Sequence, residues 1–366
     1  MNGAKPKRPR NKPSRPGKPA VWRVMIIDSA PFRKKTRAEY EKVVAALDRT
    51  RALIDEFHRK ERPGYERWFL REGDASRPTL AESTRMVRRY FPELVPIYDQ
   101  LVELAGGRDR QARLLSLWCP TPFFSGCSQL VWPAARPRLL VRNYDYAPAM
   151  CDAVFLHTRW DRRTVLVASD CLWGALDGIN DDGLAVSLAY GGRTVVGAGF
   201  AIPLVLRYVL ERCSVVAEAT EVLARVPINM AYNVTVLDAE GAFATVVLAP
   251  DRAPEIRTQA IATNHQDEDA GGRTAHAGAT RTYEREAFLA ERLADDAEPE
   301  HRLIERFLEP PLYSTRWHAG NGTLYTAAYR PASKDVELRW PGQRMQLGCA
   351  RFEDRELAVT YGPAAS

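Results

Sequence analysis

The chain has 366 residues, 45% of them apolar, and a formal net charge of +6. Its length exceeds that of a usual single core, so we expect one large domain with an appendage, or two domains. No apolar run approaches the ~20 residues that a membrane-spanning helix needs. The longest candidate, Phe200 to Leu210, is broken by Pro203 and Arg207, so the sequence predicts a soluble body without a membrane span.

The excess positive charge lies at the start of the chain. Residues 1–20 contain seven Lys or Arg and no acidic residue, together with many prolines and few apolar residues. Such a composition cannot bury enough surface to fold, so we expect a disordered arm. A solubilising extension is favoured over nucleic-acid binding for this arm. It lacks the apolar stretch of a secretory signal, and the expected location is the cytoplasm.

Six cysteines are scattered through the chain, and none belongs to a CxxC pair. This spacing argues against both a zinc site and a disulfide framework, and it fits a reducing compartment. We therefore expect no metal site.

The predicted elements change in character part-way along the chain. Helical periodicity runs through residues 36–60 and again through residues 80–107, where prolines 92 and 96 interrupt it. Short β-type runs follow, with helices predicted at 201–213, 215–225 and 283–295. These β-type runs cover residues 128–132, 138–146, 153–158, 164–169, 184–190, 232–239, 243–249, 322–329 and 335–340. Strands in succession with grouped helices indicate an α+β layered sandwich.

One cysteine stands at the start of a predicted hairpin. Two strand runs, GCSQLVW and RLLVRNYDY, are separated by PAARP, so facing residue numbers should sum to about 271. Cys127 should then face Tyr144 or Asp145. Arg142 offers a cation and Asp145 an orienting carboxylate, but no histidine lies near in sequence to take the proton of the thiol.

Gly126 suggests where that base comes from. A thiol can attack the carbonyl of the preceding residue to form a thioester that water opens, and glycine resists this geometry least. The product would begin at Cys127, and its new α-amine, with a reference pKa of ~7.7 to 8.0, would be a suitable base for the adjacent thiol.

At this point the sequence resembles a known family. The segments GCSQLVW, LLVRNYDY, DGINDDGLAVSLAYGG and IATNHQ occur in the order found in N-terminal-nucleophile (Ntn) hydrolases of the acyl-coenzyme A:6-aminopenicillanate acyltransferase type. The chain is more distantly similar to choloylglycine hydrolases and acid-ceramidase-like amidases. The resemblance covers residues 124–293, and it implies a four-layer αββα sandwich whose precursor cuts itself before the cysteine.

The resemblance also implies roles for individual residues. Cys127 would be the nucleophile, Asp145 would orient its amine and thiol, and Arg142 would support the site and contact substrate. Asn264 would donate its side-chain amide to the oxyanion. Arg285 matches a late arginine that stabilises the carboxylate side of the site.

The implied organisation has three parts: the arm 1–20, a helical pro-region 21–126, and a catalytic domain 127–366. The pro-region would stay packed on the body as a separate chain after cleavage. The substrate would be a small acyl amide, cleaved by water or transferred to another amine. No cofactor is expected, while an acyl-coenzyme A co-substrate and the oligomeric state stay open.

Three positions depart from the family pattern or carry a rival interpretation. Where choloylglycine hydrolases have an oxyanion asparagine, this chain has Tyr190, whose backbone N–H could serve instead. Strict strand alternation puts Arg142 and Asp145 on opposite faces, so we expect a bend or bulge between them. Residues 177–183, DGINDDG, are interpreted mainly as a turn.

Two other functions are kept as alternatives. A papain-like thiol peptidase would use His265 as the base of Cys127, without cleavage of the chain. A non-catalytic scaffold of the same fold would use residues 1–20 to bind nucleic acid.

Overall fold

The computed structural model describes residues 20–27, 64–123, 125–133, 137–160, 162–266, 275–295, 297–350 and 355–361. The arm predicted at residues 1–20, apart from Ala20, and the helix predicted at residues 36–60 lie outside this part of the chain. Among the described residues, no helix is both long and apolar enough to cross a bilayer.

The larger of two β-sheets is built almost wholly from antiparallel neighbours. Across this sheet the described strands are β10 (Glu255–Arg257), β9 (Phe243–Leu248), β8 (Tyr232–Leu237), β7 (Ala185–Tyr190), β6 (Gly174–Asn180), β5 (Val165–Asp170), β4 (Val154–Thr158), β1 (Ala20–Ile27) and β16 (Arg355–Val359). Seven of them, β4 to β10, follow one another in the chain, in keeping with the tendency of consecutive strands to be neighbours in space.

The second sheet carries the cysteine of interest. Its described strands are, in order, β11 (Ile261–Ala262), β2 (Gly126–Trp132), β3 (Leu139–Tyr146), β13 (Asn321–Arg330), β14 (Asp335–Trp340) and β15 (Gln343–Gly348), while β12 (Thr315–Arg316) pairs with β13. The two sheets pack face to face, and the side chain of Ser187 on β7 donates a hydrogen bond to Gln129 on β2. All residues of β2 and β3 are buried, because helices cover the other face of this sheet.

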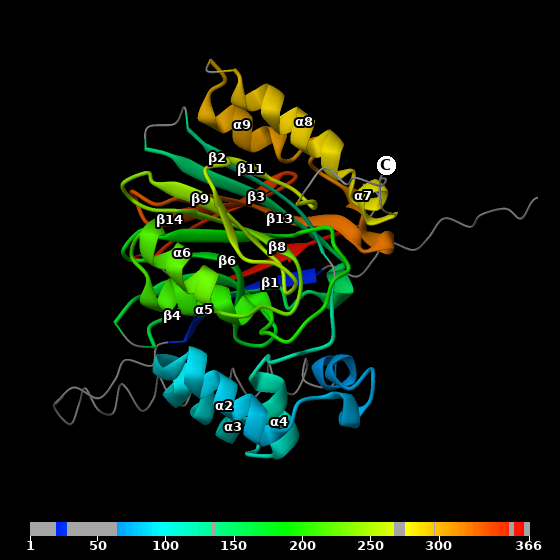
Figure 1. Ribbon diagram of the computed structural model, residues 1–366. Coiled ribbons are helices and arrows are strands. Elements are labelled where there is room, and N and C mark those ends of the chain that lie inside the picture. The colour runs from blue at the N-terminus through cyan, green and yellow to red at the C-terminus, as the bar shows by residue number, and fades with distance from the viewer. Residues whose placement is uncertain are drawn as a thin grey trace, which may run out of the picture.

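Helices lie on the outer faces of both sheets (Figure 1). One group packs on the larger sheet, a second group covers β2 and β11, and a third, from the N-terminal part of the chain, packs beyond α5. The described helices are α2 (Leu80–Tyr90), α3 (Val95–Leu104), α4 (Asp109–Leu115), α5 (Ile202–Arg212), α6 (Val216–Arg225), α7 (Ala275–Thr280), α8 (Thr282–Leu293) and α9 (Glu300–Arg306). Short 3-10 turns are η1 (Asp74–Ser76), η2 (Pro92–Leu94), η3 (Pro148–Met150) and η4 (Trp317–Ala319).

Helix α5 is buried nearly all round, which a surface helix with one apolar stripe would not be. One side packs on β6 of the larger sheet. Its other side meets the N-terminal helices: the ring of Phe91 lies 4.9 Å from that of Tyr208, whose hydroxyl donates to Glu93 at 2.7 Å. The N-terminal segment is therefore packed into the core and does not sit on it as a detachable cover.

Strand β1 ties the start of the chain into the larger sheet. It pairs in parallel with β4 and antiparallel with β16, so it has a neighbour on each side. Trp22 is buried between the sheets, with its ring 5.1 Å from Tyr325 and 5.9 Å from Trp340. A residue in this position contributes roughly 3 to 5 kcal/mol to stability, judged by the cost of truncating a buried tryptophan.

The sequence-based elements are largely confirmed. The α+β class, the strands now seen as β2 to β5, β7 to β9, β13 and β14, and helices α5, α6 and α8 lie where they were predicted. The helical stretch at 80–107 is present as α2 and α3 with the predicted break at Pro92. Strand β1 was not predicted, since residues 21–126 were expected to be helical. Residues 177–180 belong to strand β6, so the predicted turn is confined to the residues after Asn180.

Candidate active site

The β2–β3 hairpin brings together the first residues of the site. Cys127 pairs with Tyr144 and Gly126 with Asp145, as the hairpin arithmetic predicted. Since side chains alternate along a strand, Cys127, Tyr144 and Arg142 point between the sheets, while Asp145 points toward α8. The Cys127 side chain is completely buried.

Arg142 is held between the two sheets beside the thiol. Its Nη2 lies 3.1 Å from Cys127 Sγ, and its Nη1 donates to the carbonyl of Leu176 at 3.0 Å and to the carboxylate of Asp177. Asp177 comes from β6 of the opposite sheet, and both charged side chains are fully buried. The pair therefore fixes the guanidinium at the sulfur from across the sandwich.

Asp177 was missed as a site residue because the sequence interpretation placed it in a turn. It also accepts hydrogen bonds from the hydroxyls of Tyr325, at 2.6 Å, and Tyr329. These donors, with Arg142, satisfy a carboxylate that would otherwise be costly to bury. The only local signal was a carboxylate inside the apolar run GALDGIN, which is too weak to name its partner.

The interior around Cys127 disfavours its thiolate. Burial raises the pKa of Cys127, with Arg142 and Arg285 acting in the opposite direction and Asp145 adding to the increase. A raised pKa disfavours the thiolate, which is the form that attacks.

Asp145 occupies the face of the sheet that is turned toward α8. It accepts from Thr323 Oγ1 at 2.7 Å and from Arg285 Nη1 at 3.1 Å. Burial raises the pKa of Asp145 although Arg285 and Thr323 lower it. A Cβ added to Gly126 would lie 3.0 Å from Asp145 Cβ, so glycine allows the carboxylate to approach the backbone before the cysteine.

The bend expected between Arg142 and Asp145 is absent. Strand β3 keeps one continuous register with β2 from Leu139 to Asp145. The register shift lies in β13, between Thr323 and Tyr325. The two side chains therefore do lie on opposite faces: Arg142 contacts the sulfur of Cys127, while Asp145 contacts Arg285, which donates to the Cys127 carbonyl.

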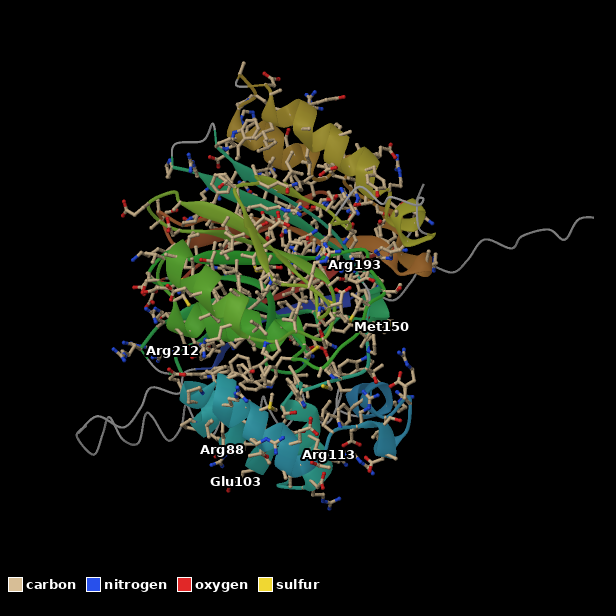
Figure 2. All side chains as sticks on the ribbon, viewed as in Figure 1. Arg88, Glu103, Arg113, Met150, Arg193 and Arg212 are labelled. Atoms are coloured by element: carbon tan, nitrogen blue, oxygen red, sulfur yellow. The ribbon has the colours of Figure 1, made fainter. Side chains whose placement is uncertain are left out.

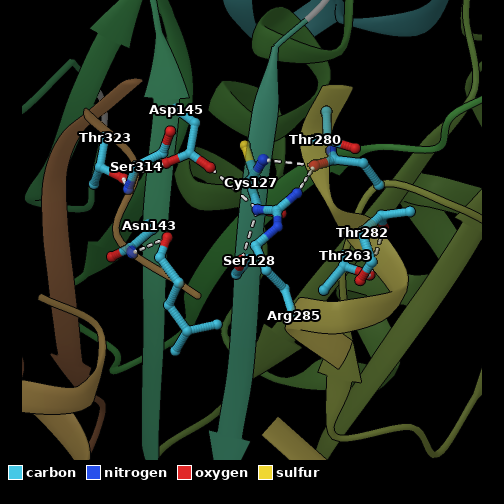
Figure 3. Close-up of polar contacts among 12 residues, drawn as sticks. Cys127, Ser128, Asn143, Asp145, Thr263, Thr280, Thr282, Arg285, Ser314 and Thr323 are labelled. Atoms are coloured by element: carbon cyan, nitrogen blue, oxygen red, sulfur yellow. Dashed lines mark hydrogen bonds and ion pairs between the residues drawn. The ribbon is translucent and has the colours of Figure 1, made fainter. Parts of the chain in front are cut away.

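Arg285 connects the remaining residues (Figure 3). From α8, its Nη1 donates to the carbonyl of Cys127 at 2.9 Å and to Ser128 Oγ at 2.7 Å, in addition to Asp145. Its Nη2 donates to Asn264 Oδ1 at 2.6 Å. A buried guanidinium with five fixed donors is well suited to hold several acceptors in one geometry.

Asn264 lies against the amide nitrogen of the cysteine. Its Oδ1 accepts from Cys127 N at 2.9 Å as well as from Arg285. Because both partners can only donate, the carbonyl end of the side chain must face them, and the amide end faces the other way. There Asn264 Nδ2 donates to the carbonyl of Tyr190 at 3.0 Å.

Tyr190 is therefore next to Asn264, but this contact uses its carbonyl and not the N–H that was predicted to serve the oxyanion. Its hydroxyl donates to the carbonyl of Arg193 at 2.6 Å. The predicted role of the Tyr190 N–H remains a prediction.

His265 is directed to other partners than the thiol. Its Nδ1 is 2.9 Å from Thr282 Oγ1 and 3.2 Å from Thr263 Oγ1, and its Nε2 is 3.1 Å from Glu286 Oε2. A papain-like peptidase needs one of these nitrogens at the thiol. The contacts of His265 instead connect the segment after β11 to α8.

Among the described residues, no group of three or more His, Cys, Asp or Glu side chains could hold a metal ion. A cavity of about 160 Å³ adjoins the site on the face of Asp145 and Arg285, and Gly126 lines it.

Residues 133–345 match the family of acyl-coenzyme A:6-aminopenicillanic acid acyl-transferase. The chain belongs to this family. The matched range holds Arg142, Asp145, Asn264 and Arg285, and it begins just after Cys127. Membership makes the protein an enzyme, either an amidohydrolase or an acyltransferase that acts on linear, non-peptide amides.

Three solved structures are similar to the chain. A mutant of conjugated bile acid hydrolase from Clostridium perfringens is 12% identical with a TM-score of 0.41, covering 66% of this chain and 97% of that one. Penicillin V acylase from Agrobacterium tumefaciens is 14% identical with a TM-score of 0.40, covering 62% and 87%. The Caenorhabditis elegans N-acylethanolamine-hydrolyzing acid amidase ortholog is 17% identical with a TM-score of 0.36, covering 57% and 93%. No curated protein matches the chain.

The first prediction concerns the buried ion pair. Replacing Asp177 with alanine leaves the Arg142 guanidinium buried without its carboxylate, which typically costs ~3 to 5 kcal/mol. We expect a loss of this size in the free energy of unfolding, measured by urea denaturation in the Cys127→Ala background. Asp182→Ala, which removes a half-exposed carboxylate paired with Arg163, is the matched control and should cost about 1 kcal/mol or less. Equal effects of the two substitutions on the free energy of unfolding would contradict the importance of the buried Arg142–Asp177 pair.

Proposed function

We propose that this protein is a self-processing cysteine Ntn enzyme with the four-layer αββα architecture, which cleaves or transfers the acyl group of a linear amide through a thioester on Cys127. One observation carries the proposal: the residues that hold Cys127 in the intact chain already contact both its sulfur and its backbone nitrogen. Arg142 lies at the sulfur, and Asn264 accepts from the nitrogen. An ordinary cysteine nucleophile uses only its sulfur, whereas an N-terminal nucleophile also uses its nitrogen, which Asn264 already contacts.

In the processing step, Cys127 Sγ attacks the carbonyl carbon of Gly126. The bond between that carbon and the Cys127 nitrogen breaks, and the proton of the thiol passes to this nitrogen, which becomes a free amine. Water then opens the resulting thioester, releasing Gly126 as a carboxylate and restoring the thiol. The complete step consumes one water molecule.

The new amine stays beside the contacts of the former peptide nitrogen. Asn264 Oδ1, 2.9 Å from this nitrogen in the intact chain, would accept one N–H of the amine and turn its lone pair toward the thiol. With a pKa near neutrality, the amine can take the thiol proton and later deliver it to the leaving nitrogen of the substrate. The raised pKa of the buried thiol makes this base necessary.

Asn264 Nδ2 is the candidate donor to the oxyanion. The two donors at Oδ1 fix which way the amide faces, so its Nδ2 is presented on the side of Tyr190. A preorganised donor of this kind lowers the barrier by ~2.7 to 4 kcal/mol. The backbone N–H of Tyr190 would be the second donor.

The thioester has two fates that use the same residues. Attack by water gives an amidohydrolase, and attack by an amine gives an acyltransferase, with an acyl-coenzyme A as a further acyl donor to the same thiol. Neither route asks for a bound metal or prosthetic group, because the thiol, the amine and the amide donor supply the chemistry.

The N-terminal chain would stay bound after cleavage. Strand β1 has neighbours on both sides of it. Phe91, just after α2, and Trp118, just after α4, pack on the residue stretch before α5, with their rings 4.6 and 4.8 Å from that of Phe200. Release of this chain would strip a strand from the sheet and expose the core, a cost far above the few kcal/mol by which domains are stable. The pro-region is thus proposed to be a permanent subunit.

The second prediction tests cleavage. The intact mass of the purified protein under denaturing conditions should show two fragments that part between Gly126 and Cys127. The Cys127→Ala variant should show one full-length chain, because alanine lacks the attacking sulfur. A single uncut chain in both samples would remove the proposed base and contradict the proposed function.

The third prediction concerns the fate of the fragments. Residues 1–126 and 127–366 should co-elute in size-exclusion chromatography under native conditions and separate only in denaturant, because β1 is paired on both edges. The uncut Cys127→Ala protein provides the elution volume of the complete particle. Loss of the smaller fragment without denaturant would show that the pro-region is not a retained subunit.

The fourth prediction concerns the oxyanion donor. Asn264→Ala should slow processing by ~100- to 1,000-fold, since one preorganised donor is removed from the tetrahedral intermediate. The measurement is the fraction of cleaved chain against time after purification of the precursor. Asn233→Ala is the control, because Asn233 holds the same loop through the carbonyls of Thr263 and His265 without contacting Cys127. If both variants slow processing equally, the effect comes from the loop and not from the donor.

A further inference from the structure

A second cavity, of about 150 Å³, lies where the N-terminal segment meets the body. Figure 2 shows Met150 at this junction, beside the first helical turns of the described chain. Four aromatic rings and two carboxylates distinguish the cavity. Its described lining is Gly64, Tyr65, Trp68, Phe123, Tyr146, Ala149, Met150, Cys151, Asp152, Asp170 and Cys171.

The cavity is connected to the nucleophile by the chain itself. Tyr146 follows on the strand that carries Tyr144, the residue that faces Cys127, and the Tyr144 hydroxyl lies 3.4 Å from Asp170 Oδ2. From the other side, Phe123 lies in the segment that leads to the Gly126 carbonyl. Two lining residues, Tyr146 and Phe123, are thus close in the chain to Tyr144 and to Gly126.

In the proposed processing step the protein is its own first substrate, and Gly126 is the acyl donor. A later substrate must place its acyl carbon where the Gly126 carbonyl was, because the same sulfur attacks it. The rest of its acyl group must then lead away as the chain does, from Gly126 toward Phe123. Phe123, which lies before Gly126 in the chain, lines this cavity.

The walls of the cavity suit a flat or narrow apolar body. Trp68 stands edge to face with Tyr65, with centroids 6.0 Å apart, and with Phe123, at 6.1 Å. A cavity of ~150 Å³ lined by apolar side chains is large enough for a benzene-sized group. The faces of such rings also attract cations.

The inner end of the cavity is acidic, and Asp170 is its most buried carboxylate. The Tyr65 oxygen is 2.7 Å from Asp170 Oδ1 and 2.8 Å from Asp152 Oδ1, but a hydroxyl has one proton and can donate to only one of them. The other groups that approach Asp170 are also neutral: the Cys171 N–H at 2.7 Å and the Tyr144 hydroxyl. Both charged side chains of the described lining are acidic, so the lining brings no cation to Asp170.

We propose that this cavity is the subsite for the acyl group of the substrate, and that it selects acyl groups whose small aromatic or aliphatic body ends in a protonated amine. The inference rests on the proposed function for its acyl-group role. An ammonium group brings Asp170 a charged donor where its described partners are neutral, and the rings around it favour that charge. A terminal carboxylate would meet the buried carboxylate of Asp170 and be excluded.

Binding to the uncut Cys127→Ala protein tests the ligand class without any turnover. Isothermal titration calorimetry should show that 4-methylbenzylammonium binds at least tenfold more tightly than the neutral 4-methylbenzyl alcohol, and that 4-methylbenzoate does not bind. Asp170→Asn should weaken ammonium binding at least tenfold. Trp68→Leu should weaken it several-fold, because it removes one aromatic ring from the wall of the cavity. Asp238→Asn is the matched control: its carboxylate is equally buried, 5% exposed, but caps α6 and a turn, and binding should be unchanged. Equal binding of the alcohol and the ammonium, or the lack of an Asp170→Asn effect, would overturn the proposed ligand class.

Turnover by the processed enzyme tests the acyl-group role. The anilide of 4-(aminomethyl)phenylacetic acid should have a kcat/KM at least tenfold above that of the anilide of 4-(hydroxymethyl)phenylacetic acid. Asp170→Asn should abolish this difference in kcat/KM. A cleaved, active enzyme with no such preference would overturn the inference and leave the proposed function standing. A chain that binds the ammonium but never cleaves itself would refute the proposed function and the acyl-group role, while the ligand class would hold.

Discussion

The buried ion pair between Arg142 and Asp177 is the interaction on which the rest of the site depends. Each partner comes from a different sheet, and both are fully buried, so neither could be left in this interior without the other. Burying a charge pair is expensive compared with packing apolar side chains. The buried pair nevertheless places a fixed positive charge 3.1 Å from the sulfur of Cys127. Burial raises the pKa of this thiol, and the positive charge of Arg142 acts in the opposite direction. The charge lowers the cost of forming a thiolate in this interior.

The second organising group is Arg285, which acts on the other side of the sheet. It joins the backbone of Cys127, the carboxylate of Asp145 and the amide of Asn264, three acceptors from segments far apart in the chain. Arg142 therefore contacts the sulfur, and Arg285 holds the backbone atoms around Cys127. Because the two guanidinium groups lie on opposite faces of β2, the side chain and the backbone of this residue are held independently. The proposed N-terminal nucleophile would use this separation, since both of its reacting groups belong to one residue.

The sequence was most informative where the geometry is local. The pairing of Cys127 with Tyr144 follows from the length of one hairpin, and it was predicted correctly. Asn264 and Arg285 lie more than 130 residues from Cys127, and only the resemblance to a family pointed to them. Asp177 and strand β1 were missed for the same reason: each acquires its meaning from a partner in a distant segment. The bend expected in β3 was wrong because two side chains on opposite faces can serve one residue when that residue offers both its side chain and its backbone.

The N-terminal segment has two tasks that favour the same arrangement. As strand β1 and helices α2 to α4, it completes the core, so it would have to stay after the proposed cleavage. As the residues from Phe123 to Gly126, it leads into the first bond that the nucleophile would cut, which requires that it end at the thiol. A segment fixed at one end in the sheet and at the other beside the thiol necessarily builds part of the wall around the acyl group, as Tyr65, Trp68 and Phe123 do. Substitutions in this segment should therefore change which amides are accepted while leaving the chemistry of Cys127 intact, and substrate choice can diverge within the family without any change at the nucleophile.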